Sequence, residues 1–194
     1  GLLFLGSLIL VIAHSYRTNT ARSWVIAMTT ALIAWIASFV MRLYLPSEIE
    51  LLKWFPGTKF EESLGLVVDY INWPYMVAVL SICVAALLTD TTRAEPGITP
   101  YSWSQTLSIT ALNLIAILAA NPLTMAIAWM ITDLVELFIL LRLSKAAELG
   151  SKIVSLFTIR IFSTFMLITA TYIAWQGQAF AGFDIMQPNA SLFF

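Results

Sequence analysis

The sequence is poor in the residues that bind metals and redox groups. Its 194 residues include a single cysteine, Cys83, and a single histidine, His14. A disulfide within the chain and a cysteine-ligated cluster are therefore excluded, and one histidine without a second cannot complete a metal site. The sequence also lacks a glycine-rich phosphate-binding loop and a Gly-x-Ser-x-Gly nucleophile elbow. We therefore expect no cofactor, no metal and no catalytic centre in this chain.

Charged residues are scarce as well. They make up 11% of the sequence, whereas hydrophobic residues make up 60% and the mean hydropathy is +0.87. A soluble domain of this size cannot bury so much apolar surface. The formal net charge of −1 gives no reason to expect nucleic acid as a partner. The composition thus predicts an all-α, polytopic transmembrane protein that is embedded in the lipid bilayer.

Apolar runs long enough to cross a bilayer as helices recur along the chain, and a helix needs about 20 residues to do so. We expect about six spans in a single transmembrane domain, at residues 1–14, 24–45, 66–89, 102–120, 122–142 and 153–175. The first run is short and opens on Gly1, which favours a fragment or a trimmed helix over a signal peptide. Between the second and third spans, a charged stretch around Pro56-Gly57 predicts a short external hairpin on the membrane surface.

Basic residues are distributed unequally between the two ends of the predicted spans. Those that follow the first, third and fifth spans are Arg17, Arg22, Arg93, Arg142, Lys145 and Lys152. Those that follow the second and fourth are Lys53 and Lys59. Because Lys and Arg accumulate in cytoplasmic loops, we expect the first set to face the cytoplasm or the mitochondrial matrix. The N-terminus and the hairpin then lie outside.

The fifth predicted span carries two carboxylates near its middle. Asn121 is a good N-cap and Pro122 suits the first helical position, so the start of this helix is well marked. Asp133 then lies roughly 18 Å into the span, and Glu136 lies about one turn deeper on the same face. Ionisable groups at this depth are costly unless they face protein or water, so they are functional candidates by default. Two acids one turn apart can hold and release a proton, which is what a relay site requires.

Two further ionisable residues fall within predicted spans. Asp69 lies near the start of the third span, and Arg160 lies in the first turns of the sixth. We therefore take Asp133, Glu136, Asp69 and Arg160 as candidate residues for proton or ion translocation. The alternative is that Asp133 and Glu136 are structural and pair with Arg160 or with a partner subunit. An arginine near a helix end can also extend to the membrane interface.

The order of these features resembles the antiporter-like membrane subunits of respiratory complex I and the multisubunit cation/proton antiporters. The stretches that carry the resemblance are Leu64-Gly-Leu-Val-Val-Asp69 with Ile71-Asn-Trp, Ala119-Ala-Asn121 with the eight-residue step to Trp129, and Lys152 to Arg160-Ile161 with Tyr172 and Gln176-Gly-Gln-Ala-Phe180. Where the family has a glutamate directly after the tryptophan, this chain has Met130, and Asp133 lies one turn further on. Phe162-Ser163 stands in place of the family's Gly-Asp. The family's lysine-bearing helix would follow Phe194.

The resemblance implies a proton- or Na⁺-translocating, antiporter-like membrane-arm subunit of an NADH:quinone oxidoreductase of the complex I type, or of a related antiporter complex. It implies other membrane subunits as partners, and a location in a bacterial or archaeal plasma membrane or in the mitochondrial inner membrane. An alternative from a different class is a non-pumping structural or assembly subunit of a larger bioenergetic complex. A lysine downstream of Phe194 in the full reading frame would favour the translocating subunit.

Overall fold

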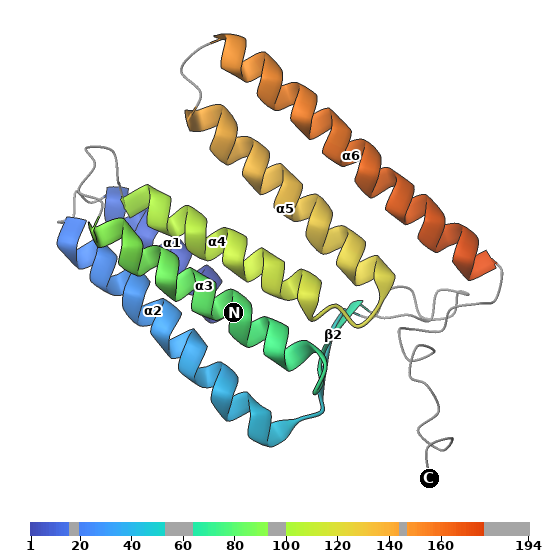
Figure 1. Cartoon of the computed structure of the whole chain (residues 1–194), viewed down its shortest axis with the longest axis horizontal. Helices are drawn as coiled ribbons and strands as arrows, with labels where there is room; N and C mark the ends of the chain where they lie inside the picture. The colour runs from blue at the N-terminus through green and yellow to red at the C-terminus, as the bar shows by residue number, and fades with distance from the viewer. Residues whose placement is uncertain (16–19, 53–63, 93–99, 144–146, 177–194) are drawn as a thin grey trace. The chain divides into compact units, whose positions relative to one another are not determined.

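The computed structural model describes residues 1–15, 20–52, 64–92, 100–143 and 147–176. These residues contain six α-helices, one short 3₁₀ turn (η1, Arg42–Tyr44) and two short strands (Figure 1). The helices are α1 (Leu2–Ser15), α2 (Thr20–Met41), α3 (Asn72–Thr92), α4 (Pro100–Ile117), α5 (Pro122–Leu143) and α6 (Ala147–Gln176). The strands, β1 (Ser47–Leu52) and β2 (Leu64–Val68), pair with each other.

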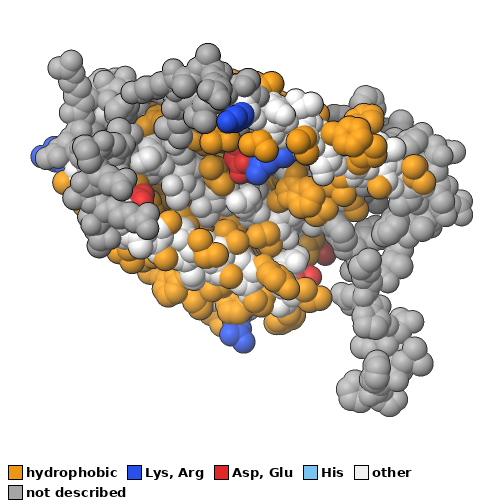
Figure 2. Space-filling model, turned by 45° about the horizontal axis from the view of Figure 1, so that its top comes forward, with side chains coloured by type: hydrophobic (Ala, Val, Ile, Leu, Met, Phe, Trp, Pro, Cys, Tyr) orange, Lys and Arg blue, Asp and Glu red, His pale blue; other side chains and the backbone are white. Residues whose placement is uncertain are grey.

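Four helical segments in the described part of the chain are long and apolar enough to cross a membrane. They are Ala21–Tyr44, Asn72–Asp90, Thr124–Leu141 and Lys152–Ala170, whereas α1 is a shorter apolar helix of 14 residues. Large hydrophobic side chains such as Phe138, Ile82 and Phe165 remain exposed. Hydrophobic side chains cover much of the face seen in Figure 2. Such a surface is stable in lipid and not in water. The chain is an integral membrane protein, and the predicted fold class is confirmed.

The helices belong to two compact units. The first comprises residues 1–47 and 68–117 and contains α1 to α4, and the second comprises residues 48–67 and 118–194 and contains α5 and α6. In the first unit α1 packs against α4 and α2, while α2 packs against α3. In the second unit α5 packs against α6. The prediction of a single transmembrane domain stays a prediction.

Small and hydroxylated residues hold α1 against its neighbours. The Oγ of Ser7 lies 2.9 Å from the Oγ of Ser104 and 2.6 Å from the Oγ of Ser108, both on α4. At the preceding position of α1, Gly6 lies directly against Thr30 of α2. Lipid supplies no hydrophobic force between helices, so close approach and hydroxyl hydrogen bonds are what hold a membrane bundle together.

The contact between α1 and α2 leaves no room for a side chain at Gly6. In Gly6→Ala the new Cβ would lie 2.8 Å from the Oγ1 and 2.9 Å from the Cβ of Thr30, so the two helices must separate. We expect this variant to lose about 1–3 kcal/mol of stability, the usual cost of overpacking. The measurement is the thermal unfolding midpoint of the full chain in detergent. Gly1→Ala is the control, because a Cβ there has nothing within 4 Å, and an unchanged midpoint for Gly6→Ala would contradict the packing.

The third helix begins six residues later than the predicted span, because residues 64–68 form strand β2. Asp69 ends this extended segment and caps α3: its Oδ1 accepts the backbone N–H groups of Ile71 and Asn72 at 2.9 and 2.6 Å. The N–H of Trp73 then donates to the carbonyl of Asp69 at 3.0 Å, which is the first helical bond. The prediction of a helix from residue 66 is wrong. Hydropathy is the same whether Leu-Gly-Leu-Val-Val forms a strand or a helix, so it could not distinguish the two.

The fourth helix ends at Ile117, so the prediction of a helix through residue 120 is wrong. Residues 118–120 instead extend alongside β2: the N–H of Val67 donates to the carbonyl of Leu118 at 2.8 Å, and the N–H of Ala120 donates to the carbonyl of Gly65 at 2.9 Å. Hydropathy contains no information about backbone pairing of this kind, and it therefore extends the predicted helix through Ala119 and Ala120.

The start of α5 agrees with the sequence prediction. The Oδ1 of Asn121 accepts hydrogen bonds from the N–H and the hydroxyl of Thr124 at 2.8 and 2.7 Å, and Pro122 is the first helical residue. The same hydroxyl of Thr124 accepts the N–H of Gly65 at 3.3 Å. The cap of α5 is thereby tied to strand β2.

Helix α6 begins at Ala147, six residues before the predicted boundary. Much of the predicted basic connection is therefore helical, which suits Ala147, Glu148 and Lys152 because all three residue types form helices well. The turn of the predicted hairpin, at Pro56-Gly57, lies outside the described residues. The strands on either side of it, β1 and β2, do pair.

Candidate functional site

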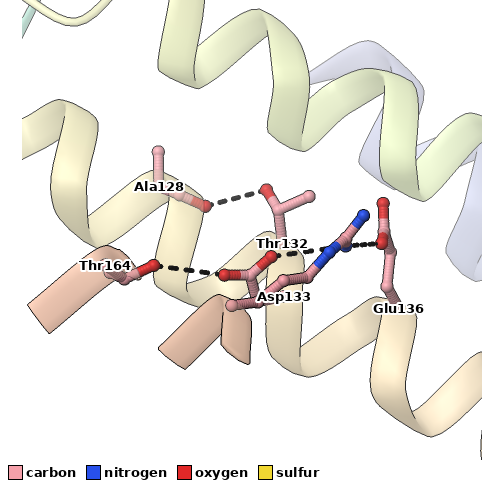
Figure 3. A network of polar contacts seen from close by, with 6 residues as sticks. Ala128, Thr132, Asp133, Glu136 and Thr164 are labelled. Carbon is pink, nitrogen blue, oxygen red and sulfur yellow. Dashed lines mark hydrogen bonds and ion pairs between the residues drawn. The ribbon is translucent and has the colours of Figure 1, made fainter. Parts of the chain in front are cut away.

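Four polar side chains in the second unit meet between α5 and α6 (Figure 3). The Nη1 of Arg160 donates to the Oδ1 of Asp133 at 3.4 Å and forms an ion pair with the Oε2 of Glu136. The hydroxyl of Thr164 donates to the other oxygen of Asp133, Oδ2, at 3.2 Å. Both oxygens of Asp133 therefore have a donor from α6. We call Asp133, Glu136, Arg160 and Thr164 the polar cluster.

Helical spacing explains how the polar cluster assembles. Asp133 and Glu136 are three residues apart on α5, and Arg160 and Thr164 are four residues apart on α6, so each pair lies on one face of its helix. Because α5 packs against α6, the two polar faces meet. The neighbouring hydroxyl of Thr132 does not take part, since it donates to the carbonyl of Ala128 at 2.8 Å.

The polar cluster lies far from the helix ends. Asp133 is 11 residues after Pro122, the first residue of α5, and Arg160 is 13 residues after Ala147, the first residue of α6. At 1.5 Å per residue these positions are roughly 17 and 20 Å along their helices. The sequence-based placement of Arg160 in the first turns of its span is therefore wrong. Its guanidinium reaches across to α5 and contacts both acids.

Charge and exposure together define what the polar cluster can do. Two carboxylates face one guanidinium, so the fully ionised cluster has one formal negative charge in excess. The exposed fraction of the side chain is 17% for Asp133, 28% for Glu136 and 53% for Arg160. Figure 2 shows acidic and basic side chains meeting within a largely hydrophobic surface. The cluster can thus accept one further positive charge from outside.

The structure brings together three of the four predicted site residues, and their part in translocation stays a prediction. Asp133, Glu136 and Arg160 come together, which is also the pairing that the structural alternative expects. Asp69 belongs to the other unit and caps α3, and its predicted part in translocation stays a prediction. The sequence patterns did not single out Thr164. Its position four residues after Arg160 was the available signal, but hydroxyl residues are common in membrane helices and most bond to their own backbone.

Among the residues that the structure describes, no three His, Cys, Asp or Glu side chains lie close enough to hold a metal ion. Cys83 is buried in α3 as a free thiol. Its surroundings are those of a small core residue.

Comparisons with known proteins give a structural neighbour and no sequence relative. No family model and no curated protein matches the sequence. The fold is similar to that of a chain in the membrane-bound sulfane sulfur reductase (MBS), an archaeal respiratory membrane complex, with a TM-score of 0.70 at 16% identity. The match covers 94% of this chain and 28% of that chain, so the present chain spans less than a third of its structural neighbour. The likeness shows that this chain shares its fold with part of a subunit of a respiratory membrane complex.

Proposed function

We propose that this chain is a proton-translocating, antiporter-like subunit of a larger membrane complex in energy metabolism, and that the polar cluster is its proton-exchange site. The observation that carries the proposal is the unbalanced cluster at mid-helix, in which two carboxylates share one guanidinium. An excess negative charge in hydrocarbon is expensive, so the cluster favours binding one cation. Neighbouring subunits of the complex would supply the energy and any redox chemistry.

The geometry favours a proton over Na⁺ as the transported ion. A sodium ion bound by both carboxylates would lie between Asp133 and Glu136, where Nη1 of Arg160 already contacts an oxygen of each. A proton needs no such space, because it adds directly to one carboxylate oxygen. Thr164 can stay in contact with Asp133 in either state, since a hydroxyl both donates and accepts.

The second candidate function is structural. Arg160 contacts both acids, and an ion-pair cluster of this kind can bind α5 to α6 without moving any ion. On this view the chain is a non-pumping assembly subunit of the same kind of complex. The two candidates differ in what happens to ion movement once the complex has assembled.

The test is ion movement by the assembled complex in vesicles. The complex is purified through a tag on this chain, reconstituted, and driven by a K⁺ diffusion potential while a pH-sensitive dye reports proton movement. We expect proton movement at equal rates when the other cation is Na⁺ or choline. A rate that requires Na⁺ would contradict the choice of proton. Equal rates for wild-type complex and for complex in which Asp133 is Asn would favour the structural candidate.

A further inference from the structure

A second distinct surface lies in the first unit, where α2 ends beside the start of α3 (Figure 1). Aromatic rings form a continuous stack there. The ring centroids of Trp35 and Phe39 are 4.7 Å apart, and those of Phe39 and Trp73 are 6.1 Å apart, both edge-to-face. The guanidinium carbon of Arg42 lies 4.8 Å from the centroid of Trp73, at the end of the stack. Arg42 is therefore held on an aromatic surface by a cation–π contact.

The indole that supports Arg42 is itself fixed. The Nε1 of Trp73 donates to the backbone carbonyl of Ser38 at 2.7 Å, which ties α3 to α2. A second indole bond runs the other way, from Nε1 of Trp35 to the Oγ of Ser81 at 2.9 Å. These two bonds orient the rings of the stack. The position of Arg42 is thus prepared in advance, which reduces the entropy that binding would cost.

No side chain in the described part of the chain compensates the charge of Arg42. Among the described residues, the salt bridges to carboxylates involve Arg160, and none involves Arg42. Asp69 is the acid nearest to Trp73 in sequence, and its Oδ1 is taken by the N–H groups that begin α3. An arginine that stacks on a ring through its face still presents its N–H donors at the edge. These donors match the oxygens of a phosphate.

Exposed apolar and aromatic side chains flank Arg42 and Trp73 in the sequence. On either side of the two residues the large exposed side chains are Leu43, Tyr44, Tyr70, Ile71 and Tyr75, each more than 60% exposed. Further along α2 and α3, Ile36, Val40 and Ile82 are also exposed. Tyrosine and tryptophan at helix ends are typical of the headgroup level of a bilayer.

We propose that Arg42, on its Trp73 platform, binds the phosphate of an anionic phospholipid whose acyl chains lie along the exposed faces of α2 and α3. The guanidinium supplies the charge and the hydrogen-bond donors, and the exposed aliphatic side chains supply the surface for the chains. A free phosphate ion would use only the first of these. An arginine with no acidic partner among the described residues, next to exposed apolar side chains, therefore favours a phospholipid over a free phosphate ion.

The test uses phosphatidylglycerol and the purified full chain in detergent, with native mass spectrometry reporting the dissociation constant of the bound lipid. We expect Arg42→Gln to raise that constant roughly tenfold, the effect of losing charge-assisted hydrogen bonds. Arg42→Lys keeps the charge but loses the planar fork, so an intermediate value is expected. The matched control is Arg22→Gln, the same change at an exposed position near the other end of α2, which should leave binding unchanged.

Three outcomes would overturn the proposal. The first is an unchanged dissociation constant for Arg42→Gln in a chain whose helix content by circular dichroism is normal. The second is an equal loss for Arg22→Gln, which would indicate a general effect of charge. The third is displacement of phosphatidylglycerol by an equal concentration of inorganic phosphate, which would identify a simple anion site.

Discussion

Asp133→Asn is expected to lower proton movement per assembled complex roughly a hundredfold, the scale of removing a positioned acid or base. Asparagine has the size of aspartate: its amide oxygen can still accept a hydrogen bond from Arg160, and its amide NH₂ can donate to the hydroxyl of Thr164, so α5 and α6 should remain together. It cannot take up or release a proton. The measurement is the dye-reported rate in vesicles, divided by the amount of complex recovered through the tag.

The controls separate a transported proton from a structural charge. Glu136→Gln should reduce the rate by much less if Asp133 is the primary site and Glu136 adjusts it through charge coupling. Asp90→Asn makes the same change near the end of α3 and should have no effect. If Asp133→Asn assembles and moves protons at the normal rate, the exchange site lies at Glu136 or outside this chain.

Arg160→Gln is expected to have the second-largest effect on proton movement, mainly because less complex assembles. Without the guanidinium, Asp133 and Glu136 face each other with no positive charge, and an uncompensated carboxylate at mid-helix costs about 3 kcal/mol. We expect a several-fold lower yield of complex and a strongly reduced rate in the complex that remains.

Restoring the charge balance should recover assembly. The wild-type cluster carries two formal negative charges and one positive, and the double variant Arg160→Gln with Glu136→Gln carries one negative and none positive, so both have the same excess. We expect the double variant to recover the yield, while Arg160→Lys should recover part of both yield and rate. A double variant that assembles no better than Arg160→Gln alone would show that the geometry of the guanidinium matters more than charge. Binding of phosphatidylglycerol should be the same in all of these variants, because the lipid surface involves other residues.

The half-exposed side chain of Arg160 can make further contacts in the proposed complex. The present chain spans 28% of the MBS chain. Measurements on the assembled complex include contacts from neighbouring subunits, whereas measurements on the isolated chain do not. The polar cluster is therefore best tested in the complex, and the lipid surface in the full chain by itself.

Composition and local pattern alone determined the class of protein and the position of α5. A soluble domain cannot bury the apolar surface of a chain that is 60% hydrophobic. The Asn121-Pro122 pair predicts the start of α5 at the residue where the helix begins in the structure. The spacing of Asp133 and Glu136 places both acids on one face of any helix that contains them. These inferences depend on neighbours within one turn of helix, which sequence records directly.

Only the tertiary structure decided the remaining features, because they depend on contacts between distant residues. The backbone of residues 64–68 pairs with residues 118–120, and this pairing turns two stretches that hydropathy assigns to helices into extended chain. Hydropathy assigns Arg160 to a helix end, whereas the true start of α6 places it at mid-helix against two acids. The hydroxyl of Thr164 and the guanidinium of Arg42 acquire their partners only when helices pack, since the residues involved are 31 positions apart in each case. Hydropathy reports whether a segment prefers an apolar or a polar environment. It contains no information about which other segment packs against it.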